Sequence, residues 1–431
     1  MRRAGVVVAL RRAAVQFTRT ADSCFRVGSS ARSQHRNERT VSLHLAVASP
    51  LDVHRLADEL NLKPFGGGIL PVGHGGHSVT ELVLALSPLV DQLDLITLDP
   101  EIDAPIELRS QHIRCWVAPL RSRPRERSKD FFRVERHFIA ERLRRVRPDA
   151  VSAHWTYEYA LGSLDSGRPV LTTVRDWAPT ILRNNTDAYR TLRLAMQVMT
   201  FVRGREFAAA SPYMARRVQG ITRRPCGVLP NALGASWFVP EVIVPPSRLV
   251  LAVNNGFGRR KNVGTLLQAW PLVLNHEPTA ELLLVGSGYQ PEGEAHLWAQ
   301  RRGLDKGVRF LGPQARDALP EMLRSSRVFV HPALEESFGM VVLEAMAMGV
   351  PVLGGRSSGA VPWLLAEGAG VLVDVRQPRA IAAGILRLLA EGPFAESTAQ
   401  RGFARAKEQF AVEEVAAAYL SRLTALGDSR S

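Results

Sequence analysis

Short apolar runs alternate with amphipathic stretches along most of the chain, beginning at Val41. In the first half, this pattern predicts alternating strands and helices over residues 41–48, 81–89, 93–97, 131–146, 150–153 and 170–174. Strands that alternate with helices are typical of a parallel sheet covered by helices on both faces. The first half therefore predicts a doubly wound α/β domain.

The alternation breaks and then resumes. Pro240, Pro245 and Pro246 lie in the break, and such a segment is typical of a linker. Beyond it, the pattern predicts strands over residues 249–253, 281–286, 308–312, 328–331 and 350–353. It predicts helices over residues 340–348, 378–391 and 395–426. Asn262 is expected to be the N-cap of the helix after the first of these strands, and Pro271 is expected to kink or end that helix.

We therefore expect two doubly wound, Rossmann-like domains, over residues 41–230 and 249–400, joined by a linker over 231–248. Residues 401–426 are expected to form a C-terminal helix that crosses back to the first domain. Ligands of such folds bind beyond the carboxyl ends of the strands, here in the cleft between the domains.

Length and composition agree with this picture. The 431 residues exceed what one hydrophobic core organises, and 46% hydrophobic with 22% charged residues is the composition of a globular protein. The three cysteines lack paired spacing, and no apolar run is long enough to cross a bilayer. A reducing, cytoplasmic location is expected.

The net charge of +14 is concentrated in two segments. Residues 1–40 hold nine arginines against two acidic residues, and residues 121–148 hold eleven Lys and Arg against four acidic residues. The rest of the chain balances, so a nucleic-acid binder is not expected. The first segment is interpreted as a tail or a mis-called start, with a transit peptide as the alternative.

The second basic segment places Phe131, Val134, Phe138 and Ile139 near one helical face, with arginines over much of the rest. One interpretation is a solvated helix face on the first domain. The other is a peripheral contact with an anionic membrane, on the inner face, where a lipid-linked acceptor would lie. The sequence leaves both open.

The most informative stretch runs from His331 to Val352. It places Glu336 in a turn after a strand and Glu344 on the helix that begins near Phe338. Backbone N–H groups at the start of a helix bind phosphate, and a carboxylate one turn further in accepts hydrogen bonds from ribose hydroxyls. Taken alone, two glutamates at this spacing support only a surface pair.

The whole stretch, with seven residues between its glutamates and then Ala-Met-Ala-x-Gly-x-Pro-Val, resembles the signature of family-4 retaining glycosyltransferases, which have the two-domain GT-B fold. Further segments resemble the family in the same order, over roughly residues 41–426. They are the glycine loop Gly75-Gly76, the segment 228–231, Lys261, the strand end with Gly286 and Gly288, and residues 308–312.

The resemblance implies transfer of a sugar from a nucleoside-diphosphate sugar to an acceptor hydroxyl, in cell-surface polysaccharide, glycolipid or glycoside synthesis. It implies catalytic roles for Glu336, Lys261, Arg260 and Arg175, with Arg259 as the alternative to Arg260. It implies donor binding by Gly75, Gly76, Gly286, Gly288, Ser337, Phe338, Gly339, Met340 and Glu344. No Asp-x-Asp triplet is present, so no metal and no further cofactor is expected.

Three departures from the family pattern stand out. Asn255 and Gly256 occupy the position of a frequent arginine, Arg175 that of a frequent histidine, and Trp363 that of a frequent glutamate. They keep open a catalytically silent sugar-nucleotide-binding protein, and a sugar phosphorylase on the same fold is a further alternative. A serine hydrolase based on Ser357 is not expected, because no histidine follows it in the chain.

Overall fold

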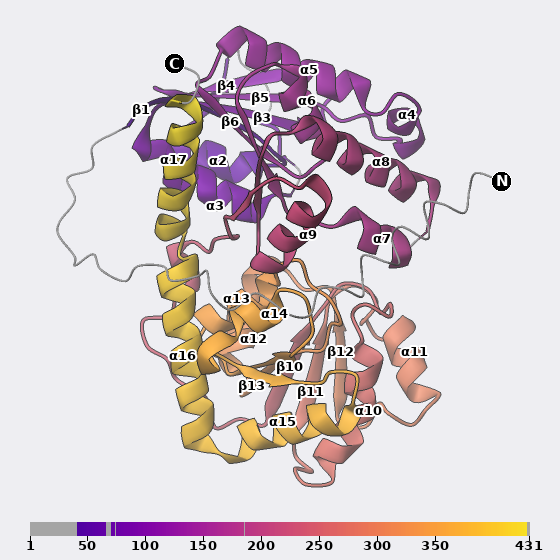
Figure 1. Ribbon diagram of the computed structural model, residues 1–431. Coiled ribbons are helices and arrows are strands. Elements are labelled where there is room, and N and C mark those ends of the chain that lie inside the picture. Colours follow the sequence, from indigo (N-terminus) through magenta and orange to yellow (C-terminus); the bar gives the residue numbers. More distant parts are fainter. Residues whose placement is uncertain (1–40, 66–69, 74, 185, 429–431) are drawn as a thin grey trace. The chain divides into compact units, whose positions relative to one another are not determined.

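The structure is a computed structural model that describes residues 41–65, 70–73, 75–184 and 186–428. The predicted tail over residues 1–40 and His74 of the glycine loop lie outside the described residues. Two sheets organise the described part of the chain, and the predicted doubly wound α/β fold is confirmed (Figure 1).

The first sheet has nine strands in the order β2-β4-β5-β3-β1-β6-β7-β8-β9. Their bounds are Val41–Ala48 for β1, Lys63–Pro64 for β2, Val90–Asp99 for β3, Ile106–Arg109 for β4, Ile113–Pro119 for β5, Ala150–His154 for β6, Val170–Val174 for β7, Glu206–Ala209 for β8 and Cys226–Val228 for β9. All pairings are parallel except those of β4 with β2 and β5. The antiparallel edge, which the alternation did not predict, lies beside β5 at one side of the sheet.

Helices cover both faces of this sheet. They are α2 (Val53–Leu60), α3 (His77–Leu86), α4 (Pro124–Lys129), α5 (Arg133–Val146), α6 (Glu158–Asp165), α7 (Ala178–Asn184), α8 (Ala188–Arg203) and α9 (Pro212–Thr222). Alternate residues of β1 enter opposite cores: Leu45 and Val47 pack on one face, Ala46 and Ala48 on the other. Side chains that alternate along a strand explain why its sequence is apolar throughout.

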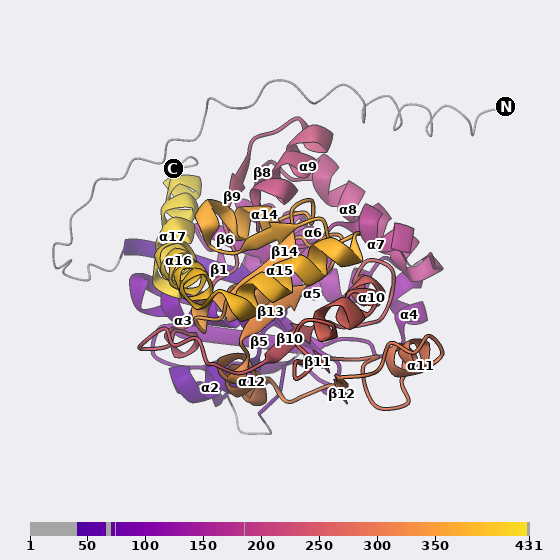
Figure 2. The same cartoon turned by 90° about the horizontal axis from the view of Figure 1, so that it is seen from below.

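The second sheet has six parallel strands in the order β12-β11-β10-β13-β14-β15. Their bounds are Leu249–Val253 for β10, Glu281–Val285 for β11, Val308–Gly312 for β12, Val328–His331 for β13, Val352–Gly355 for β14 and Val371–Val373 for β15. The helices are α10 (Val263–Leu274), α11 (Glu294–Gln300), α12 (Leu319–Ser325), α13 (Met340–Ala347), α14 (Val361–Leu364) and α15 (Pro378–Ala390). Seen from below, α10 and α15 lie together in front of the strands (Figure 2).

Of two local expectations, the N-cap position of Asn262 is confirmed, whereas the end of α10 at Pro271 is not. Asn262 stands at the N-cap of α10, but its side chain caps no backbone N–H. Its amide instead donates to the carbonyls of Pro332 and Val375, which ties α10 to two neighbouring loops. Pro271 does not end α10, which continues to Leu274. The carbonyl of Pro271 still accepts a hydrogen bond from the N–H of Asn275, so the helical path continues past the proline.

The predicted helix over 395–426 is two helices, α16 (Gly392–Phe410) and α17 (Val412–Asp428), separated by the extended residue Ala411. Helix α16 packs on α13 of the second half, and α17 packs on α3 and β6 of the first (Figure 1). At the junction, Leu233 accepts a hydrogen bond from the N–H of Val412 and donates one to the carbonyl of Phe410. The chain therefore passes between the halves twice, with the two passages hydrogen-bonded to each other.

No helix in the part of the chain that the structure describes is long and apolar enough to span a bilayer.

Candidate functional site

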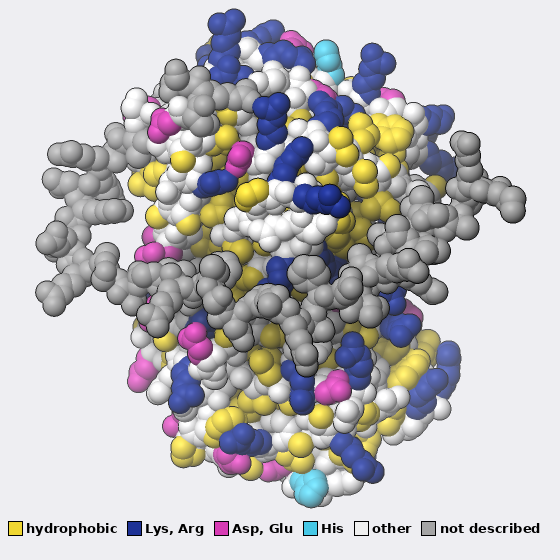
Figure 3. All heavy atoms as spheres, in the orientation of Figure 1, with side chains coloured by type: hydrophobic (Ala, Val, Ile, Leu, Met, Phe, Trp, Pro, Cys, Tyr) yellow, Lys and Arg dark blue, Asp and Glu magenta, His cyan; other side chains and the backbone are white. Residues whose placement is uncertain are grey.

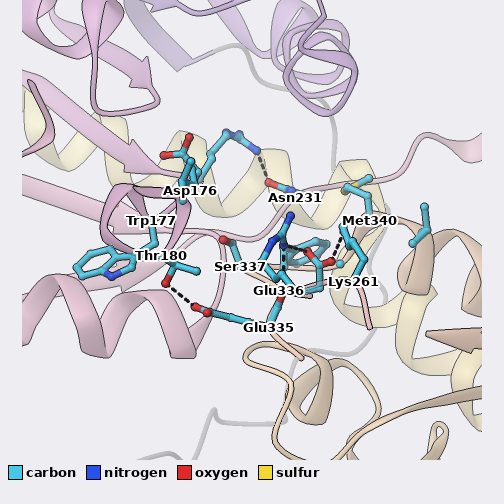
Figure 4. A pocket seen from close by; sticks show the side chains of 15 residues that line it. Asp176, Trp177, Thr180, Asn231, Lys261, Glu335, Glu336, Ser337 and Met340 are labelled. Carbon is cyan, nitrogen blue, oxygen red and sulfur yellow. Dashed lines mark hydrogen bonds and ion pairs between the residues drawn. The ribbon is translucent and has the colours of Figure 1, made fainter. Parts of the chain in front are cut away.

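A pocket of about 360 Å³ lies where residues beyond the strand ends of the two sheets meet. The first half contributes the segment after β7 and the residue Asn231, and the second half contributes the turns after β10 and β13 (Figure 4). The lining residues are Arg175, Asp176, Trp177, Thr180, Ile181, Asn231, Arg260, Lys261, Glu335, Glu336, Ser337, Phe338, Gly339, Met340 and Val341. Both sheets therefore present their carboxyl ends to one cavity, as parallel sheets do with their ligands.

A buried ion pair forms the floor of the pocket. Lys261 Nζ lies 2.6 Å from Glu336 Oε1, and the two side chains are 16% and 14% exposed (Figure 4). Arg260 Nη1 lies 3.7 Å from the other carboxylate oxygen, and the buried His331 lies 3.3 Å from Glu336 Oε1. Burial would raise the pKa of Glu336, but the contact with His331 and the charge of Lys261 outweigh it and lower that pKa. Glu336 is therefore ionised throughout the neutral range.

The turn that carries Glu336 is held in place by residues 358–363, which pack against it. Gly359 pairs with Glu336 in an isolated bridge, and a Cβ on Gly359 would lie 2.3 Å from the Glu336 carbonyl oxygen. The buried Ser358 hydroxyl donates to the carbonyl of Ala333 at 2.5 Å. The sequence 358–363, which departs from the family pattern, thus acts as the support of the turn. Within it, the ring of Trp363 packs edge-on against Phe338.

Helix α13 begins directly at the pocket. Its N-cap, Gly339, has a φ of 104°, a conformation that favours glycine. The carbonyl of Gly339 already accepts from Val342 and Leu343, while residues 337–341 line the pocket wall. The N–H groups of the first turn have no acceptor within a helix, so this wall favours an anionic ligand.

Arg175 lies on the first-half side of the pocket and is only 8% exposed. It donates to His154 Nδ1 through Nε at 3.0 Å, to the Oδ1 of Asn231, and to Ser78 Oγ of α3 at 3.4 Å. Burial lowers the pKa of Arg175, and burial together with the Arg175 charge lowers that of His154. His154 is therefore neutral and serves as an acceptor, so the arginine is held by neutral partners.

Glu344 lies outside this pocket. It is 2% exposed, it pairs with Arg316 at 3.1 Å, and burial raises its pKa against the opposing effect of that arginine. Arg316 also lies 5.2 Å from the ring of Trp237. The two glutamates of the signature thus occupy separate environments, one inside the pocket and one buried outside it beside Arg316.

The glycine positions also lie outside the pocket. Gly76 has a φ of 75°, and a Cβ there would lie 1.9 Å from the carbonyl oxygen of Pro50, whereas Gly75 has open space around it. Gly286, with a φ of 120°, lies against the backbone of Asn254, and Gly288 follows in the same loop. These four glycines are required by, or compatible with, the loop conformations. Ser78, two residues after Gly76, accepts a hydrogen bond from Arg175 of the pocket.

Several lining residues carry polar chemistry that the sequence did not single out. Thr180 and Tyr213 both donate to Glu335 Oε1, at 3.0 and 2.6 Å, so the first half hydrogen-bonds directly to the turn before Glu336. Asp176 accepts a hydrogen bond from Tyr157. The position of Thr180 and Asp176 after a buried strand was the available signal, but their partners come from distant segments.

The residues at the departures from the family pattern lie as follows. Asn255, exposed, accepts hydrogen bonds from the N–H and hydroxyl of Ser287 and does not line the pocket. Arg260, rather than Arg259, is the arginine beside Glu336. Among the described residues, no group of three or more His, Cys, Asp or Glu side chains is arranged to hold a metal ion.

Asp176 generates a test of this geometry. Burial, partly offset by the hydrogen bond from Tyr157, raises its pKa from 3.8 to about 6. Between these values the folded state binds more protons than the unfolded state, so wild-type stability falls as pH rises from about 4 to 6. Asp176→Asn keeps the acceptor oxygen but does not titrate. We therefore expect the difference in unfolding free energy, variant minus wild type, to be roughly 2 kcal/mol larger at pH 8 than at pH 4.5. Urea unfolding of both proteins at the two pH values measures this, and an equal stability difference at both would contradict it.

Known proteins resemble this chain in sequence and in fold. Residues 247–391 match the family described as Glycosyl transferases group 1. O-antigen chain mannosyltransferase B of Escherichia coli is 36% identical over 151 residues, which are 35% of this chain and 39% of that protein. D-inositol 3-phosphate glycosyltransferase of Streptomyces avermitilis is 36% identical over 170 residues, 37% of this chain and 36% of that protein. The matches thus span less than two fifths of these relatives.

The fold comparison extends over most of the chain. Sucrose-phosphate synthase from Thermosynechococcus elongatus superimposes with a TM-score of 0.68 and 21% identity, covering 90% of this chain and all (100%) of that one. A likeness at this identity carries the arrangement of the two sheets and not the reaction. By this likeness the chain has the GT-B fold, and within it residues 247–391 match the glycosyl transferases group 1 family.

Proposed function

We propose that the protein is a retaining, metal-independent glycosyltransferase that moves a sugar from a nucleoside-diphosphate sugar to an acceptor hydroxyl. The observation that carries the proposal is the pocket in which Lys261, Arg260 and the start of α13 converge around Glu336. The proposed setting is the synthesis of a cell-surface polysaccharide, glycolipid or glycoside, because the relatives are named for O-antigen and inositol-phosphate glycosylation. The proposed location is the cytoplasm.

Departure of the nucleoside diphosphate is the step that needs the most electrostatic help, because negative charge develops on the leaving oxygen. Lys261 and Arg260 bring two cations to the pocket, and the first turn of α13 adds N–H donors. Preorganised donors and charges in a water-poor site stabilise such charge without reorganisation. The pair with Glu336 holds Lys261 in place until a diphosphate enters.

Glu336 is proposed to orient hydroxyl groups of the donor sugar, since its carboxylate is ionised and can only accept hydrogen bonds. Glu344 is proposed to accept from the ribose hydroxyls. In a same-face reaction, the acceptor oxygen bonds to the anomeric carbon as the phosphate oxygen leaves, and that phosphate oxygen takes the acceptor's proton. Arg175 and Asn231 line the same pocket from the first half of the fold.

A first prediction separates the roles of the two glutamates. We expect Glu336→Gln to lower transfer by at least a hundredfold with nucleotide affinity within a fewfold of wild type, because one preorganised contact is worth about 2.7–4 kcal/mol. Glu344→Ala should instead weaken nucleotide binding. A thermal-shift screen of UDP, GDP and ADP identifies the nucleotide, and titration and transfer assays follow.

The exposed Glu414→Gln serves as the matched control for this pair. Wild-type transfer by Glu336→Gln would refute the assignment. Nucleotide binding without transfer to any acceptor would favour the silent alternative. Cleavage of a glycoside that depends on inorganic phosphate and releases a sugar phosphate would favour a phosphorylase.

A second prediction concerns Lys261. We expect Lys261→Ala to lower kcat/KM by a factor that corresponds to a loss of roughly 2–4 kcal/mol of transition-state stabilisation. Lys261→Arg should recover only part of that loss. Because removal of one partner leaves Glu336 buried without its cation, a melting curve accompanies each variant. The double variant Lys261→Met/Glu336→Gln restores a neutral pair, so it should fold but remain inactive. The exposed Lys306→Ala is the control, and a fully active Lys261→Ala would overturn the role.

A peripheral membrane contact through residues 121–148 is the remaining part of the proposal. Ile139 of this segment is buried in the core, but Phe131 and Val134 are 39% and 57% exposed. Val198 and Val202 of α8 are also exposed, and hydrophobic side chains gather beside Lys and Arg side chains over α4 and α8 in Figure 3. Apolar side chains between cations suit the surface of an anionic bilayer.

This contact predicts salt-sensitive binding to vesicles. We expect the protein to sediment with anionic liposomes at low salt and to be released at about 0.5 M salt, where screening shortens the range of surface charges. The variant Arg125→Gln/Lys129→Gln/Arg133→Gln should lose this binding, while Arg205→Gln/Arg301→Gln/Arg379→Gln, at exposed positions elsewhere, should retain it. Wild-type protein that stays in the supernatant at low salt would leave residues 121–148 as a solvated face.

A further inference from the structure

A second pocket of about 400 Å³ adjoins the first and is rich in arginine. We name it the arginine pocket; its lining residues are Thr180, Arg183, Asn184, Arg217, Arg259, Arg260, Leu334, Glu335 and Arg376. It shares Thr180, Arg260 and Glu335 with the first pocket, so the two cavities have a common wall. Like the first, it is built from both halves of the fold.

The positive charge of this pocket exceeds what its own carboxylate neutralises. Arg217 pairs with Glu335 at 2.9 Å, and Arg260 is shared with Glu336 of the first pocket. Arg183, Arg259 and Arg376 are exposed, and none of the ion pairs within the described residues includes them. Three guanidinium groups, one from helix α7 and two from separate loops of the second half, thus line one cavity without an ion-pair partner among the described residues.

The chemistry of these groups selects the ligand. Guanidinium groups repel one another unless an anion lies between them, and their planar forks match phosphate oxygens in pairs. A single carboxylate supplies one negative charge and would leave most of the excess uncompensated. A phosphate monoester or a diphosphate supplies two or three, which balances three unpaired arginines.

We infer that the arginine pocket binds a phosphate or diphosphate group carried by the acceptor, so that the substrate that receives the sugar is a phosphorylated molecule. This inference rests on the proposed function. The donor diphosphate is assigned to the wall formed by residues 337–341, and none of those residues lines the arginine pocket. Across the common wall, an acceptor anchored by its phosphate has its sugar hydroxyl next to Glu336 and the donor sugar.

Both halves of the fold contribute arginines to this pocket. Arg183 and Arg217 come from α7 and α9 of the first half, whereas Arg259 and Arg376 follow β10 and β15 of the second. A phosphate held by both sets adds a bridge beside the hydrogen bond from Thr180 to Glu335. Binding of the acceptor therefore favours the arrangement in which the halves meet, and the acceptor contributes to the closure of its own site.

Binding of inorganic pyrophosphate to protein already saturated with its nucleoside diphosphate tests the inference, since the nucleotide blocks the donor site. We expect saturable binding by calorimetry, no binding of uncharged glucose, and at least a tenfold rise in Kd in Arg183→Gln/Arg259→Gln/Arg376→Gln. Nucleotide Kd and melting temperature should stay within twofold and a few degrees of wild type. The matched control, Arg205→Gln/Arg301→Gln/Arg379→Gln, should bind both ligands as wild type does.

Two further measurements show whether the phosphate-bearing acceptor is lipid-linked or water-soluble, and which result would overturn the inference. Dodecyl diphosphate in neutral detergent, compared with pyrophosphate, separates a lipid-linked acceptor, which binds the alkyl form more tightly, from a water-soluble one, which binds both equally. Absence of pyrophosphate binding to the nucleotide-loaded protein, or unchanged affinity in the triple variant, would overturn the inference. Failure of every nucleotide to bind would instead refute the proposed function, so the two outcomes are distinct.

Discussion

The ion pair between Lys261 and Glu336 is the contact on which the site depends, because it joins the turn after β10 to the turn after β13. Both side chains are largely removed from water, and desolvation of two charges costs several kcal/mol unless partners compensate for it. His331 below and Arg260 beside the carboxylate supply that compensation. Around this carboxylate, Lys261 and Arg260 bring two positive charges against one negative charge, so this side of the pocket favours an anionic group.

The support of this pair reaches the other half of the fold. Glu335, next to Glu336, accepts hydrogen bonds from Thr180 and Tyr213 and pairs with Arg217. The carboxylates of neighbouring residues thus have different tasks: one holds a cation within the second half, and the other fastens the first half to it. A change in the relative position of the halves would displace Glu335 first. Because Glu336 is the next residue in the chain, the change would also shift Glu336.

Much of the framework was predictable from the sequence, and the reason is local. Buried parallel strands are apolar throughout, so β1, β7, β10, β11 and β13 are recognised by their own residues. The pocket positions of Lys261, Arg260, Glu336 and residues 337–340 follow from motifs at strand ends. The strands β2, β4, β5, β8, β9 and β15 were not predicted. All of them except β5 have only two to four residues, and such short runs carry little periodic signal.

The partners of the site residues were not predictable in the same way. The bonds of Arg175 to His154 and Asn231 join segments 21 and 56 residues apart, and their meeting depends on strand order and on the path of the linker. Glu344 and the four glycines lie beyond the cavity itself, because spacing along the chain does not say which side of a turn a residue takes. The role of residues 358–363 behind Glu336 likewise required the packing of Gly359 and Trp363.

The double passage of the chain between the halves constrains how the halves can move. At Leu233 and residues 410–412 the outgoing and returning segments are fastened to each other by two backbone hydrogen bonds. Two connections side by side form a hinge. Such a hinge permits the two halves to rotate about the line that joins the connections, and it resists twisting or sliding of one half against the other. Opening would then widen the cleft most at its far rim and least at the axis, so a ligand enters and leaves from the rim while the residues near the axis keep their mutual distances.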